Sequence, residues 1–173
     1  FARGDILRCW LHVKSSTCKD SPAIVTGLVK FFSTQDCTVF LVGGYLRDSL
    51  LGRAVGDLDV AVSCDPQTLA RRLAKELGGS YVALSPQRGV ARVVLPAPTA
   101  TTPEPPWLLG HTGMELGIND ALTDSLNIDV AGFPTSIEDD LARRDFTVNA
   151  MALPLTDWAS AQWRERVVDP YNG

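Results

Sequence analysis

Two aspartates separated by a single residue, Asp57 and Asp59, are the side chains in this sequence best suited to chemistry. Residues i and i+2 of a β-strand point to the same face, so the two carboxylates should project together. Paired carboxylates of this kind can share Mg²⁺. The alternative is a solvated strand edge without a ligand.

A double glycine, Gly43-Gly44, follows the apolar run at residues 39–42 and precedes a short predicted helix at residues 45–51. Glycines allow backbone N–H groups to approach phosphate oxygens, and a helix presents its positive end at its N-terminus. Together with the two aspartates, this turn predicts a site for a nucleoside triphosphate and its metal ions.

A second group of polar residues lies within Ile137–Leu153, which reads IEDDLARRDFTVNAMAL. Arg143 and Arg144 could bind phosphates or stack on a nucleotide, and Asp145 and Asn149 could bond ribose hydroxyls. Taken alone, the same residues could form a helix with a solvated charged face.

Asp129 stands in the predicted strand 127–131, between apolar neighbours that should face the other side. A third carboxylate near the metal ions could accept the attacking proton or complete the metal shell. The alternative is an exposed strand position with no role in the chemistry.

The pattern of apolar residues predicts an α+β domain, a mixed sheet with helices largely on one side. Predicted strands occupy residues 39–42, 58–63, 80–84, 90–95, 127–131 and 166–170. Predicted helices occupy residues 21–34, 45–51 and 65–77, and a further helix starts near residue 135. Residues 97–126, rich in Pro, Thr and Gly, are predicted to be a mobile insertion.

The length of 173 residues and the 45% hydrophobic content suit one domain with a real core, and no apolar run is long enough to span a membrane. The net charge of −4 implies no broad basic face. An RNA partner would therefore be gripped largely by other parts of the protein. Four cysteines without a CxxC spacing predict reduced thiols in a cytoplasmic protein.

Four motifs in order, LVGGxLRD, DLD, DLxRRDFTxNAMA and DPYNG, resemble the bacterial-type tRNA nucleotidyltransferase and poly(A) polymerase family. The resemblance covers about residues 39–173, apart from the insertion. It implies a polymerase-β-like nucleotidyltransferase head domain that transfers CMP or AMP from CTP or ATP to an RNA 3′ end. Pyrophosphate would be released, with two Mg²⁺ ions as cofactors.

The resemblance also implies roles for individual positions. It makes Asp57 and Asp59 the metal ligands. The nucleotide-binding positions it implies are Gly43, Gly44, Arg47, Asp48, Arg143, Arg144, Asp145 and Asn149. The glycines would form the phosphate-binding turn, which Asp48 braces, and Arg47 would contact the triphosphate. Pro134 departs from the family, which often has arginine there.

Residues 1–38 are predicted to form an N-terminal helical lead-in. The resemblance predicts a head domain at 39–173, and neck, body and tail domains downstream. The leading interpretation is CCA addition to the 3′ end of tRNA. A-adding, CC-adding and poly(A)-polymerase forms share these head motifs, so they stay open as alternatives. Two further functions also stay open, a related enzyme acting on a small molecule and a non-catalytic nucleotide- or RNA-binding module.

Overall fold

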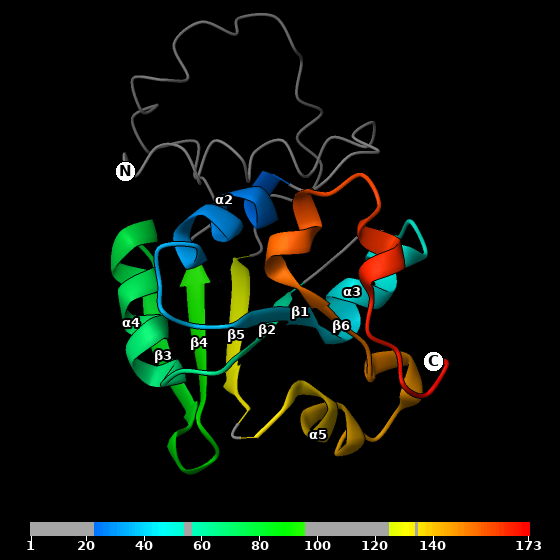
Figure 1. Cartoon of the computed structure of the whole chain (residues 1–173). Coiled ribbons are helices and arrows are strands. Elements are labelled where there is room, and N and C mark those ends of the chain that lie inside the picture. The colour runs from blue at the N-terminus through cyan, green and yellow to red at the C-terminus, as the bar shows by residue number, and fades with distance from the viewer. Residues whose placement is uncertain (1–22, 54–56, 96–124, 134) are drawn as a thin grey trace, which may run out of the picture.

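The computed structural model describes residues 23–53, 57–95, 125–133 and 135–173. In this part of the chain, six strands form one mixed sheet in the order β3-β4-β5-β2-β1-β6 (Figure 1). Strands β2 and β5 run parallel, and the other neighbouring strands run antiparallel. The strands are β1 (Val39–Val42), β2 (Leu58–Val62), β3 (Ser80–Ser85), β4 (Val90–Leu95), β5 (Leu126–Gly132) and β6 (Ala152–Pro154).

Four α-helices and four short 3₁₀ helices complete the described chain. The α-helices are α2 (Ala23–Phe32), α3 (Gly43–Leu50), α4 (Pro66–Leu77) and α5 (Ile137–Ala142). The 3₁₀ helices are η1 (Pro86–Arg88), η2 (Thr147–Asn149), η3 (Leu155–Ala159) and η4 (Trp163–Arg166). Among the described helices, none is long and apolar enough to cross a membrane.

The two faces of the sheet are covered differently. Leu28 of α2 and Leu69 of α4 join the buried cluster that contains Val60 of β2. Leu141 of α5 belongs to a second cluster with Ala61, the next residue of β2. Successive strand residues point to opposite faces, so α2 and α4 cover one face and α5 covers part of the other. The prediction of helices largely on one side is confirmed.

Helix α4 forms as its sequence predicts. The Asp65 side chain accepts a hydrogen bond from the backbone N–H of Thr68 over 2.8 Å, and proline occupies the first turn. Gly78 ends the helix in the left-handed conformation at φ 69°. Leucines four residues apart point into the core, because that spacing follows one face of a helix.

Several boundaries differ from the sequence prediction. Helix α3 begins at Gly43, two residues early, because the glycine pair forms its first turn. Strand β6 was not predicted, since three residues give too short a pattern. The strand predicted at residues 166–170 is a single bridge between Val168 and Ala152, and η4 takes up its first residue.

Cys37 and Cys64 form a disulfide, with their Cα atoms 5.5 Å apart. The prediction of reduced thiols is therefore wrong for this pair. The two cysteines are 27 residues apart in sequence, and only the antiparallel pairing of β1 with β2 brings them together.

Several predicted segments lie outside the described residues. They include residues 1–22 of the lead-in, nearly all of the 97–126 insertion, and Pro134. The insertion as predicted runs one residue too far, because Leu126 begins β5. The division into a lead-in and a head domain stays a prediction.

Candidate active site

The glycine turn lies directly against one of the two predicted metal ligands. Gly43 is buried and has φ +69°, a conformation that residues with a Cβ rarely adopt. A Cβ placed on Gly43 would stand 2.8 Å from Oδ2 of Asp59 and 3.4 Å from Nη1 of Arg144. Glycine is therefore required here for two reasons, backbone conformation and space.

Helix α3 starts at this turn, and no described side chain caps its N-terminus. The first N–H groups of a helix have no partner within the helix, and they carry its partial positive charge. The end of β1 thus delivers unused donors to the edge of the carboxylate pair. This arrangement can bind phosphate oxygens.

The carboxylates of Asp57 and Asp59 lie in different environments. Asp59 lies on β2 directly opposite Asp129 of β5 in the parallel register. Burial, and then the nearby charge of Asp129, raise the pKa of Asp59 to about 6, although Arg144 opposes the shift. Asp57 precedes β2, is more exposed, and accepts a hydrogen bond at Oδ1 from Asn127 Nδ2 over 3.1 Å.

These carboxylates fit a magnesium site that is completed by substrate. Among the described residues, no group of three His, Cys, Asp or Glu side chains is arranged to hold a metal ion. Mg²⁺ is commonly held by one or two carboxylates together with water and substrate phosphates. A nearby cation would also offset the burial and repulsion that raise the pKa of Asp59.

Arg92 of β4 is a site residue that the sequence reasoning missed. Its Nε and Nη2 donate to the two oxygens of Asp129 over 2.6 and 2.7 Å, and Nη2 lies 4.0 Å from Oδ2 of Asp57. The hydrogen bonds to Asp129 raise the pKa of the guanidinium. The sequence did hold one sign of its role, since Arg92 is the lone charged residue in the otherwise apolar run VARVVL.

The glycine motif and the arginine motif meet at Arg47. Its Nε and Nη2 donate to the two carboxylate oxygens of Asp48 over 2.9 Å each, and its Nη1 donates to Oδ1 of Asn149 over 2.8 Å. The hydrogen bond from Arg47 lowers the pKa of Asp48. The structure thus brings together three residues that were predicted to serve one nucleotide site.

The two arginines of the second motif follow α5, which ends at Ala142, and so do not lie along a helix face. Both pair with Asp140, Arg143 over 2.7 Å and Arg144 over 3.2 Å. Arg144 also donates to the backbone carbonyl of Asn149 over 3.3 Å. Asp145 is exposed beside them. Arg144 therefore connects α5, η2 and the glycine turn.

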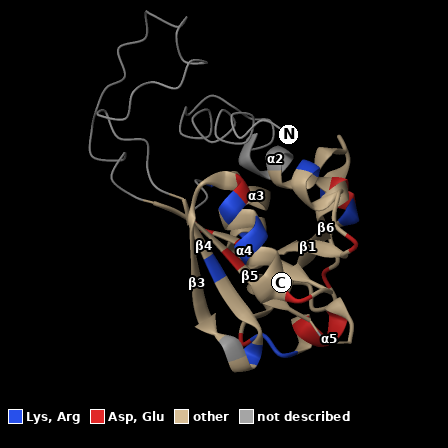
Figure 2. Cartoon of the chain, turned by 90° about the vertical axis from the view of Figure 1, so that its left-hand side faces the viewer, with Lys and Arg blue, Asp and Glu red and all other residues tan. Residues whose placement is uncertain are grey.

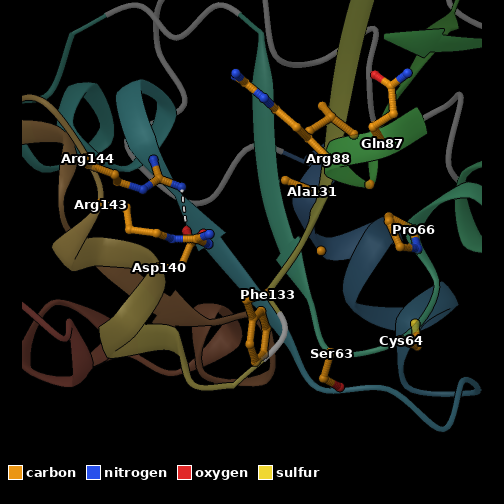
Figure 3. A pocket seen from close by; sticks show the side chains of 13 residues that line it. Ser63, Cys64, Pro66, Gln87, Arg88, Ala131, Phe133, Asp140, Arg143 and Arg144 are labelled. Carbon is orange, nitrogen blue, oxygen red and sulfur yellow. Dashed lines mark hydrogen bonds and ion pairs between the residues drawn. The ribbon is translucent and has the colours of Figure 1, made fainter. Parts of the chain in front are cut away.

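An open cleft of about 840 Å³ extends from these arginines past the ends of β2 and β5 to the start of β4. Figure 3 shows Arg143 and Arg144 on one side and Arg88 across the opening, with Phe133 at one end. Three arginines and one aspartate are its charged lining residues, so the cleft is locally positive in an acidic chain. In Figure 2, basic and acidic positions are otherwise interspersed along the ribbon.

Comparisons with known proteins find several that are similar to this chain. Residues 39–173 match the family model described as the Poly A polymerase head domain. The chain is 35% identical over 139 residues to an A-adding tRNA nucleotidyltransferase of Halalkalibacterium halodurans, covering 78% of this chain and 28% of that protein. It is 36% identical over 114 residues to a CC-adding tRNA nucleotidyltransferase of Geobacter sulfurreducens, covering 66% and 21%.

Among solved structures, the Thermotoga maritima CCA-adding enzyme complexed with tRNA is similar, with a TM-score of 0.61 and 25% identity. That match covers 96% of this chain and 33% of the other. The chain spans less than a third of the length of the two curated relatives described above.

Proposed function

This chain belongs to the Poly A polymerase head domain family, and on that premise we propose that it is the catalytic head of a template-independent RNA nucleotidyltransferase. It would add CMP and AMP from CTP and ATP to the 3′ end of tRNA. The observation that carries the proposal is the closeness of Gly43 to Asp59, since a Cβ on Gly43 would stand 2.8 Å from Oδ2 of Asp59.

Asp57 and Asp59 would hold Mg²⁺. When bound, the metal would lower the pKa of the RNA 3′-hydroxyl and neutralise charge on the departing pyrophosphate. The residues of the chain would orient the reacting groups. The hydroxyl would attack the α-phosphate in line, and the pyrophosphate would leave from the opposite side.

The triphosphate would lie over the N-terminus of α3, where Gly43 and Gly44 let it approach the backbone. Arg47 supports this placement, because Asp48 and Asn149 hold its guanidinium on two sides. A guanidinium fixed in this way loses little freedom when it binds a phosphate.

The second motif would bind the sugar and phosphates of the nucleotide. Arg144 is three-quarters buried and reaches toward Gly43 and Asp59, so it would act at the point where the nucleotide meets the metal. Asp145 and Asn149 would contact ribose hydroxyls. The positive cleft lined by Arg143 and Arg144 offers space for a polyanionic substrate.

The order of nucleotide addition differs among relatives of this chain. The two curated relatives differ in activity, A-adding and CC-adding, although both align with this chain. We propose CCA addition, with A-adding, CC-adding and poly(A)-polymerase activity as alternatives. We also propose that neck, body and tail domains follow this head and grip tRNA, and that the protein works in the cytoplasm.

Replacement of Asp59 by alanine tests the proposal. We expect Asp59→Ala to abolish nucleotide transfer and Mg²⁺-dependent nucleotide binding while circular dichroism shows an intact fold. Asp36→Ala, at an exposed turn, is the matched control and should behave as wild type. Substantial transfer by Asp59→Ala would contradict the two-metal role. Nucleotide binding without any transfer by wild type would favour a non-catalytic module.

A further inference from the structure

Three charged residues form a row across the sheet. Asp59 on β2 pairs with Asp129 on β5, and Asp129 pairs with Arg92 on β4. Directly paired residues on neighbouring strands point to the same face. The side chain of Asp129 therefore stands between a candidate metal ligand and a guanidinium.

Both oxygens of Asp129 are already bound by Arg92. The two hydrogen bonds, of 2.6 and 2.7 Å, have the parallel fork geometry of a strong arginine–carboxylate pair. The side chains of Arg92 and Asp129 are 31% and 22% exposed, so water screens the pair only in part. To ligate a cation, Asp129 would have to give up charge-assisted hydrogen bonds.

The same guanidinium also faces Asp57. Nη2 of Arg92 lies 4.0 Å from Oδ2 of Asp57, and Asn127 holds the other oxygen of Asp57. The single positive charge of Arg92 thus lies beside both Asp57 and Asp129. Without it, Asp57 before β2, Asp59 on β2 and Asp129 on β5 would have no guanidinium from β4 beside them.

We infer that Arg92 is a positioning residue that keeps Asp129 out of the divalent-cation shell and limits that shell to Asp57 and Asp59. The inference rests on the proposed function, because it presumes a cation at those two aspartates. In the sequence analysis, Asp129 was a candidate general base or metal ligand. The inference gives it another role. The carboxylate of Asp129 holds Arg92 in place, and the positive charge of Arg92 offsets part of the negative charge of the site.

Titration of this chain with Mn²⁺ in the absence of nucleotide tests the inference, with free Mn²⁺ measured by electron paramagnetic resonance and Mg²⁺ as competitor. We expect Arg92→Ala to bind Mn²⁺ more tightly than wild type, roughly tenfold, as expected for one unit charge removed beside a divalent cation. Arg92→Lys, which keeps the charge, should stay near wild type. Adding Asp129→Asn to Arg92→Ala should remove the gain.

A merely structural role for Arg92 would change unfolding but not cation affinity, so equal Mn²⁺ binding by Arg92→Ala and wild type would overturn the inference. Weaker binding would also overturn it, and would indicate that Arg92 orients Asp57 for the metal. Arg92→Gln, which keeps a hydrogen-bond donor without the charge, replaces the alanine variant if that variant does not fold.

Two controls separate this inference from the proposed function. Arg72→Ala, an exposed position on α4, should leave Mn²⁺ binding unchanged. Asp59→Ala should abolish it. Binding that requires Asp59 but ignores Arg92 would contradict only the role of Arg92, whereas no Mn²⁺ binding by wild type would contradict the cation site itself.

Discussion

Nη1 of Arg47 donates a hydrogen bond to Oδ1 of Asn149 over 2.8 Å, and this contact joins two motifs that lie 102 residues apart in the sequence. Helix α3 and the 3₁₀ helix η2 are thereby fixed to each other at the point where the triphosphate is proposed to lie. Asp48 holds the same guanidinium from within α3. Contacts within the chain therefore hold together the residues of the proposed nucleotide site.

We expect Asn149→Ala to weaken Mg²⁺–ATP binding roughly fivefold, the effect of losing about 1 kcal/mol of hydrogen bonding that holds Arg47 in place. Fluorescence titration with an ATP analogue measures the affinity. Gln162→Ala, at an exposed position, serves as the amide control. Unchanged affinity in Asn149→Ala would show that Asp48 alone is enough to hold Arg47, and would contradict the proposed contact of Asn149 with the ribose.

Gly43 and Gly52 offer a matched pair of substitutions, since both have positive φ, +69° and +65°. An alanine at either position should cost about 1 to 2 kcal/mol of stability through backbone strain. A Cβ at Gly52 meets nothing within 4 Å, whereas a Cβ at Gly43 meets Asp59. We therefore expect Gly43→Ala to lose nucleotide transfer and additional stability, and Gly52→Ala to keep transfer.

Urea unfolding measures the two free energies, and nucleotide incorporation measures the activities. Equal losses of activity in the two variants would indicate that backbone strain matters and the contact with Asp59 does not. Full activity in Gly43→Ala would contradict the proposed phosphate turn.

The raised pKa of Asp59 predicts a pH-dependent stability in buffer without divalent cations. The folded-state pKa is about 6 and the ordinary value is 3.8, so the folded protein binds this proton more tightly than the unfolded chain does. The resulting stabilisation is complete below pH 4 and is lost as the pH rises through 6. Asp59→Asn removes this dependence and should be more stable at pH 7, by at most about 3 kcal/mol.

Unfolding of wild type and Asp59→Asn between pH 4 and pH 8 measures the difference in stability, in which the contributions of groups that do not interact with Asp59 cancel. Mg²⁺ should reduce the difference in stability between the two proteins at pH 7, because it should bind and stabilise only wild type. A difference between the two proteins that does not vary with pH would contradict the account of Asp59.

The disulfide between Cys37 and Cys64 closes a loop between residues 27 apart in sequence. Its removal should cost about 3 to 4 kcal/mol of stability, if constraint of the unfolded chain dominates. We expect reduction to lower the unfolding midpoint of wild type and to leave a Cys37→Ser, Cys64→Ser variant unchanged. Mass spectrometry after alkylation, with and without reduction, counts the thiols directly. Free Cys37 and Cys64 in the purified protein would contradict the cross-link.

Local patterns were enough to predict the parts of the site that lie on single elements. The alternation around Asp59 predicted strand β2, and the glycine pair predicted the turn before α3. Arg92 was missed because its importance comes from Asp129, a partner on another strand. That pairing depends on the strand order of the sheet, which no local pattern encodes. The prediction of reduced thiols failed for the same reason.

Nucleotide incorporation into tRNA tests most directly whether this chain transfers nucleotides to RNA with the help of its carboxylate pair. The protein that carries this chain with its downstream domains would be incubated with Mg²⁺, labelled CTP or ATP, and tRNAs ending before CCA, after C and after CC. Product lengths would then be read for wild type and Asp59→Ala. Ordered addition of C, C and A by wild type, lost in Asp59→Ala, is the predicted result. No incorporation into any of these RNAs by wild type would contradict the account.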